Sequence, residues 1–167
     1  MQRQPTLLSS CARAATAAEA RFRISAPAFG PRESRIIGLD EQSALLVRDL
    51  AGKPWGGGRF LEFEAALPDD ALLRRASGGT ALLSEELDGA DAVVMIAMAA
   101  DSAEAASIIG DAAAARGIMS AGLVLPGNAL GEARNDGVVA ALRPNAMVLV
   151  VLREADDLPE MLSALRV

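Results

Sequence analysis

The sequence predicts an α/β fold, in which helices cover a mainly parallel sheet. Short apolar segments that read as strands alternate with segments of helical periodicity, and glycine and proline separate them. Two of the apolar segments, 92–98 and 118–125, contain almost no polar residue. Such runs are typical of strands that are covered on both faces. The chain has 167 residues and is 51% hydrophobic, so one domain with a substantial core is expected.

Five strands and their crossovers account for most of the chain. The strands are expected at residues 35–39, 59–64, 92–98, 118–125 and 146–152, and the alternating pattern of 59–64 favours an edge strand. Asp40 is expected to cap a helix over 41–51, and Pro68-Asp69-Asp70 to open a short helix. Further helices are expected over 81–87, 101–116, 128–143 and from 156 onward. Right-handed crossovers then predict a three-layer Rossmann-like sandwich with strand order about 2-1-3-4-5.

The first 30 residues differ from the rest and are predicted to form an N-terminal tail, separate from a single domain over 31–167. The tail is rich in alanine and serine, and Glu19 is its only acid against several arginines. This composition resembles an organellar transit peptide, and it also fits a solvated tail. We expect the tail to contact its own domain or a partner. The candidate partner-contact residues are Arg3, Arg13, Arg21 and Arg23, together with Trp55 in the turn 53–58.

Composition excludes several classes of function. The net charge of -6 argues against nucleic-acid binding, which needs a basic face. The chain lacks histidine and tyrosine and has one cysteine, Cys11, which excludes a histidine triad, a histidine metal site and an internal disulfide. No metal or cofactor site is predicted. A Mg²⁺ ion held by carboxylates alone, or a ligand that depends on Mg²⁺, stays an open alternative. No apolar run is long enough to span a bilayer, so a cytoplasmic location is expected. The abundance of arginine and alanine suggests a bacterial genome of high GC content.

Several segments follow one another in a recognisable order. The segments are Arg35-Ile36-Ile37-Gly38, then Gly57-Gly58-Arg59-Phe60-Leu61, then 85–96, then Gly117-Ile118-Met119-Ser120-Ala121-Gly122-Leu123-Val124, and finally 136–142 with 147–151. This order resembles the nucleotide-binding half of the tubulin and bacterial FtsZ family. The resemblance covers about residues 35–152 and implies a nucleotide-binding scaffold.

Two loops depart from that family. Its glycine-rich first loop is replaced by residues 39–43, and its glycine- and threonine-rich signature loop by residues 98–104. Phosphates bind to backbone N–H groups at helix N-termini, where glycine permits a close approach. Acidic residues stand at both places here and would repel a phosphate. A polymerising GTPase is therefore not expected.

The candidate ligand site lies where the first and third strands end, because α/β sheets bind ligands at this switch point. It would hold Asp40, Glu41, Ser43, Asp101 and Ser102. Two interpretations stay open: an acidic pocket for a cation, an amine or a Mg²⁺-carried ligand, and two capped helix starts. In the second, Asp101 forms a capping box with the glutamate three residues later.

Three further features each have a functional and a structural interpretation. The family resemblance places Glu132 and Arg134 near its nucleotide contacts, whereas helical charge of this kind usually forms a solvated face. Trp55 is either part of a lid or partner contact, or an indole packed in a turn. The turn Ser77-Gly78-Gly79-Thr80 is either a small anion nest or the break that ends the preceding predicted helix.

Three functions follow as hypotheses. The first is a non-catalytic accessory or interaction subunit with a protein partner or a second copy, on a degenerate nucleotide-binding scaffold. The second is a binding protein for a nucleotide or another small ligand with altered contacts. The third is a small α/β enzyme that uses the carboxylates of Asp40, Glu41 and Asp101.

Overall fold

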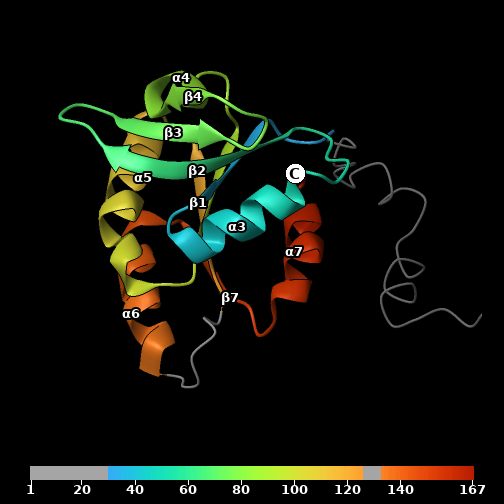
Figure 1. The fold of residues 1–167 in the computed structure, drawn as a ribbon, viewed down its shortest axis with the longest axis vertical. Helices are drawn as coiled ribbons and strands as arrows, with labels where there is room; N and C mark the ends of the chain where they lie inside the picture. The colour runs from blue at the N-terminus through green and yellow to red at the C-terminus, as the bar shows by residue number, and fades with distance from the viewer. Residues whose placement is uncertain (1–29, 126–132) are drawn as a thin grey trace, which may run out of the picture. The chain divides into compact units, whose positions relative to one another are not determined.

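A computed structural model describes residues 30–125 and 133–167 of the chain, and residues 31–167 belong to one compact unit. The predicted α/β class is confirmed, with helices on both sides of a mixed sheet (Figure 1). Among the described residues, no helix combines the length and the apolar character that a membrane crossing requires.

The sheet has seven strands in the order β4-β3-β2-β1-β5-β6-β7. The strands are β1 (Ser34–Gly38), β2 (Gly58–Ala66), β3 (Ala71–Arg75), β4 (Thr80–Leu82), β5 (Ala92–Ala97), β6 (Met119–Val124) and β7 (Val148–Val151). Five of them, β2, β1, β5, β6 and β7, are parallel neighbours in the order that the sequence predicts. The predicted number of strands is wrong, because β3 and β4 extend the sheet as antiparallel strands beside β2.

This extension corrects two local predictions. Residues 68–75 do not start a helix: Ala71 and Leu73 are buried at alternate positions, which is the periodicity of a strand. β2 is consequently an inner strand, paired with β1 on one side and β3 on the other, and not an edge strand. The helix predicted over 81–87 is shorter, because residues up to Leu82 pair with β3.

Helices cover both faces of the sheet. They are α3 (Glu41–Leu50), α4 (Leu83–Leu87), α5 (Ala103–Ala115), α6 (Ala133–Leu142) and α7 (Leu158–Ala164), with short 3₁₀ turns η1 (Ala100–Ser102), η2 (Arg143–Asn145) and η3 (Ala155–Asp157). Apolar residues of α4, α5 and α6 form one core with one face, and those of α3 and α7 form a second core with the other. Figure 1 shows α5 and α6 on one side of the strands and α3 and α7 on the opposite side.

Asp70 joins the β2–β3 turn to the start of α4. Its Oδ1 accepts hydrogen bonds from the N–H groups of Ala71 at 2.8 Å and Ser84 at 3.1 Å, and its Oδ2 accepts one from Ser84 Oγ at 2.5 Å. Partial burial raises the pKa of the Asp70 carboxyl, but the hydrogen bonds from Ser84 and Ala71 outweigh it, so the pKa lies below its usual value. The ionised form therefore stabilises this corner.

We predict that Asp70→Ala lowers the free energy of unfolding at pH 7 by about 1–3 kcal/mol, because three donors lose their acceptor. A carboxyl whose folded pKa is depressed stabilises the fold above its unfolded pKa of about 3.9 and loses this effect as the pH falls through the folded value. The difference between variant and wild type should thus shrink as the pH falls below the unfolded pKa. Urea unfolding at several pH values measures it, and a difference that is constant with pH would contradict the assignment.

Candidate functional site

The predicted switch point lies at the carboxyl ends of β1 and β5, where Asp40 follows β1. One oxygen of its carboxylate, Oδ1, accepts the N–H of Ser43 at 2.9 Å in the first turn of α3. The other, Oδ2, accepts the N–H groups of Met98 at 2.7 Å and Ala99 at 3.2 Å in the turn after β5. A single carboxylate therefore links the two turns that border the crevice.

Two serines complete this network. Ser43 Oγ accepts the backbone N–H of Asp40 at 3.0 Å, which closes a capping box and confirms Asp40 as the predicted N-cap of α3. Ser102 Oγ lies 3.0 Å from Asp40 Oδ2 and 2.8 Å from the carbonyl oxygen of Ala99, and its single proton can donate to either acceptor. Ser43 and Ser102 are both fully buried, so the structure brings these three predicted site residues together.

A close approach of β1 to α3 places Asp40 between the two turns. A Cβ atom at Gly38 would lie 2.8 Å from both the Cα and the backbone nitrogen of Ala44, so this position accepts only glycine without a backbone shift. The start of α3 consequently packs directly on the end of β1, and the N–H group of Ser43 in its first turn points at the Asp40 carboxylate.

The two other acidic residues of the predicted site stand apart from this network. Glu41 and Asp101 are both exposed. The capping box predicted for Asp101 and Glu104 is wrong: the chain first makes the 3₁₀ turn η1, which contains Asp101, and α5 has Ser102 at its N-cap with no side-chain cap. Among the described residues, no group of three acidic or cysteine side chains is placed to hold a metal ion.

The Asp40 network has the form of an anion site. Backbone N–H groups at a helix start and in the neighbouring turn are the groups that bind phosphate oxygens in sheets of this kind. Here the N–H groups of Ser43, Met98 and Ala99 donate to a carboxylate of the chain itself. The Asp40 carboxylate therefore satisfies these donors within the chain itself.

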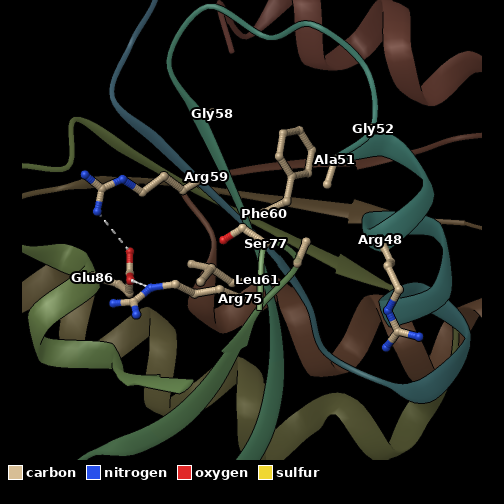
Figure 2. Close-up of a pocket in the computed structure, with 11 residues that line it drawn as sticks. Arg48, Ala51, Gly52, Gly58, Arg59, Phe60, Leu61, Arg75, Ser77 and Glu86 are labelled. Atoms are coloured by element: carbon tan, nitrogen blue, oxygen red, sulfur yellow. Dashed lines mark hydrogen bonds and ion pairs between the residues drawn. The ribbon is translucent and has the colours of Figure 1, made fainter. Parts of the chain in front are cut away.

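A second candidate lies at the amino end of β2. It is a cavity of about 440 Å³ between the end of α3, the start of β2, the turn after β3, and α4. Figure 2 shows Arg59 and Arg75 converging on Glu86 on one side, Arg48 on the other, and Phe60 between them. The lining residues are Arg48, Ala51, Gly52, Gly58, Arg59, Phe60, Leu61, Arg75, Ala76, Ser77 and Glu86.

Glu86 is the buried centre of an arginine cluster. Its carboxylate lies 2.6 Å from Arg75 Nε, 3.4 Å from Arg59 Nη1 and 3.7 Å from Arg35 Nε, while its backbone oxygen accepts Arg35 Nε–H at 2.6 Å. Arg35 is also 3.6 Å from the exposed carboxylate of Glu33. Burial, followed by the nearby charge of Arg59, lowers the pKa of Arg35, and Glu86 and Glu33 only partly oppose this.

Glu62 has a similar position on the opposite face of β2. It is buried, and Arg48 donates to it through two nitrogens at 2.9 and 2.7 Å, while Arg74 Nε lies 3.3 Å from it. The hydrogen bonds and charge of Glu62 raise the pKa of Arg48. Arg48 is thereby fixed at the wall of the cavity.

Sequence reasoning missed this arginine cluster. The alternating polar and apolar residues from Arg59 to Glu64 were a usable signal, because they place Arg59 and Leu61 on one face and Phe60 and Glu62 on the other. The pairing of Arg75 with Glu86 depends on β3, and the sequence pattern predicts a helix in its place.

The remaining predicted residues are placed as follows. Trp55 is partly buried, donates its indole N–H to the Leu50 oxygen at 2.8 Å and packs on Phe60, as the packed-indole interpretation expects. Its role as a partner contact stays a prediction. Arg134 belongs to α6, but its side chain is outside the described part of the chain. Glu132 and the tail residues Arg3, Arg13, Arg21 and Arg23 also lie outside the described residues.

No protein-family model matches the chain, and no curated protein matches it.

We predict that Asp40→Ala lowers the free energy of unfolding by about 2–4 kcal/mol, because a helix cap and the acceptor of two further backbone N–H groups are lost together. Asp101→Ala is the matched control: the same substitution removes an exposed carboxylate from the neighbouring turn and should change stability by less than about 0.5 kcal/mol. Chemical denaturation measures both. Equal effects of the two substitutions would contradict a special role of Asp40.

Proposed function

We propose that the chain is a non-catalytic protein-interaction subunit of the cytoplasm, built on an FtsZ-like, Rossmann-type scaffold that has exchanged nucleotide contacts for internal ones. The observation that carries this proposal is the Asp40 carboxylate, which accepts the N–H groups of Ser43, Met98 and Ala99. A phosphate placed against these donors would have to displace the carboxylate and would be repelled by its charge.

The candidate catalytic carboxylates also favour a non-catalytic role. Asp40 is fully engaged by donors, whereas Glu41 and Asp101 are exposed to solvent. A general base or nucleophile works in contact with its substrate and with a partner that tunes its pKa. The contacts of Asp40 instead connect one turn of the chain to another, which is a structural task.

The β7 edge of the sheet supports an interaction role. β7 pairs with β6 and, within the described ranges, with no other strand. Apolar side chains are exposed to 43% at Val148 and 50% at Val151 in this strand, and to 76% at Met147 directly before it. An uncharged, apolar edge strand of this kind readily pairs with a strand of another chain.

A second copy of the chain is the occupant that β7 fits best. Residues 146–151 carry no charge, so an antiparallel pair of β7 strands would place only apolar side chains opposite one another. A two-fold axis beside β7 would then join the sheets of two copies into one and cover the β7 edge of each, as isologous interfaces do.

We predict that GTP with Mg²⁺ leaves the backbone amide signals of Ser43, Met98 and Ala99 unchanged in ¹H–¹⁵N NMR spectra, because their N–H groups already donate to Asp40. The amide of Gly117, in the turn after α5, is the reference for non-specific effects. Saturable shifts confined to the three amides would show that nucleotide enters the crevice, and would contradict the proposal.

We predict that the full chain forms a dimer that dissociates on dilution and that Val151→Lys is monomeric, because two lysines brought together at the strand edge would repel. Leu45→Lys is the matched control, since Leu45 is exposed to a similar degree, 58%, on α3. Light scattering coupled to size-exclusion chromatography over a range of concentrations measures the mass. A monomeric wild type, or equal dimerisation of wild type and Val151→Lys, would overturn self-association through β7.

A further inference from the structure

We propose that the cavity at the amino end of β2 binds a small organic phosphate monoester, with its phosphate on Arg59 and Arg75 and its apolar part against Phe60. This site shares no residue with the Asp40 crevice or with β7, so it stands independently of the function proposed above.

The register of the strands creates the cavity. The last pair between β2 and β3 joins Leu61 to Arg75, whereas β2 begins at Gly58. β3 therefore offers no partner to Gly58 and Arg59, and side chains from α3 and α4 form the walls instead. The volume of about 440 Å³ falls within the range of about 300–1,000 Å³ that is usual for small-molecule sites.

The charge of the lining favours an anion. Three arginines, Arg48, Arg59 and Arg75, line the cavity together with one acid, Glu86, although the whole chain has a net charge of -6. The buried Arg35 places a further guanidinium 3.7 Å from the carboxylate of Glu86. Burial is the main cause that lowers the pKa of Arg35, and the nearby charge of Arg59 adds to it.

The arginines differ in how many donors they can offer. Arg48 is held by Glu62 through two nitrogens, and Arg75 is held by Glu86 through Nε at 2.6 Å. Arg59 makes one long contact of 3.4 Å with Glu86, and its side chain is 58% exposed. Most of the N–H groups of Arg59 are thus available. Guanidinium groups bind phosphate oxygens through paired N–H donors, and a guanidinium whose position is already fixed loses less entropy on binding.

The apolar floor distinguishes an organic phosphate from the bare ion. Phe60 and Leu61 are buried at the base of the cavity, and Ala51 lies on the α3 side. A phosphate alone would leave the partly exposed apolar surface of Ala51 and Ala76 in contact with water, whereas an attached ring or short alkyl group would cover it and gain about 25 cal/mol for each Å² of apolar surface buried.

Trp55 provides a local reporter. It is the only tryptophan, the chain has no tyrosine, and the centroid of its ring lies 5.6 Å from that of Phe60. Intrinsic fluorescence excited in the indole band therefore comes from a residue packed against the wall of the cavity.

The test is a titration of the full chain with phenyl phosphate, followed by Trp55 fluorescence and by calorimetry. We expect saturable binding that weakens with added salt, at least about tenfold weaker binding of inorganic phosphate and of benzoate, and no binding of phenol. Arg59→Met should weaken the binding of phenyl phosphate at least about tenfold, and Arg59→Lys should restore only part of it, because lysine lacks the paired donors. Arg153→Met, the same change at an exposed position outside the cavity, should bind like wild type.

Three results would overturn the proposal: no saturation up to about 10 mM phenyl phosphate, equal affinity of wild type and Arg59→Met, or inorganic phosphate binding as tightly as phenyl phosphate. Binding of a poly-glutamate peptide without binding of phenyl phosphate would assign the cavity to an acidic protein partner and would overturn it as well. Thermal unfolding of each variant confirms that a loss of binding does not reflect a loss of fold.

Discussion

The Asp40 carboxylate joins the turn after β1 to the turn after β5, and the centre of the sheet is organised around this contact. The carboxylate caps α3 and accepts hydrogen bonds from two backbone N–H groups 58 and 59 residues further along the chain. It also accepts a hydrogen bond from the Ser102 hydroxyl. Because Gly38 lets α3 pack closely on β1, these donors converge on one point. The fold thereby supplies its own anion where α/β sheets commonly bind an external one, and we propose that the function lies at other surfaces.

The same physical constraint recurs at two glutamates. Glu62 and Glu86 are buried, and a buried carboxylate is tolerated only when charged or hydrogen-bonding partners surround it. Arginines from α3 and β3 surround Glu62, and arginines from β1, β2 and β3 surround Glu86. At Asp40 and Glu62 the partners close the site. At Glu86 the arginines outnumber the acid, and the excess donors open into a cavity.

The sequence predicts the centre of the fold better than its edge. Strands buried on both faces leave long apolar runs, so β5 and β6 and the order of the parallel strands could be predicted. β3 could not be predicted, because Pro68 and Asp70 are typical of a helix start. The two arginines at the end of β3 also interrupt the alternation of polar and apolar residues that indicates a strand. The helix cap by Asp40 could be predicted, since the N–H group that donates to it belongs to Ser43, three residues along the chain. Its bonds to Met98 and Ala99, like the Glu86 cluster, depend on tertiary contacts between distant residues, which no local pattern contains.

Chemical rescue tests most directly whether Asp40 occupies an anion site. Asp40→Gly keeps a residue that is tolerated at a helix N-cap and removes the carboxylate. Introduced together with Arg59→Met, which weakens the separate arginine cavity, it leaves the donors of Ser43, Met98 and Ala99 open to solvent anions. Formate or phosphate at millimolar concentration should then raise the melting temperature of the double variant by several degrees more than that of Arg59→Met alone. Equal shifts in the two proteins would contradict the assignment of Asp40 as an internal substitute for a bound anion.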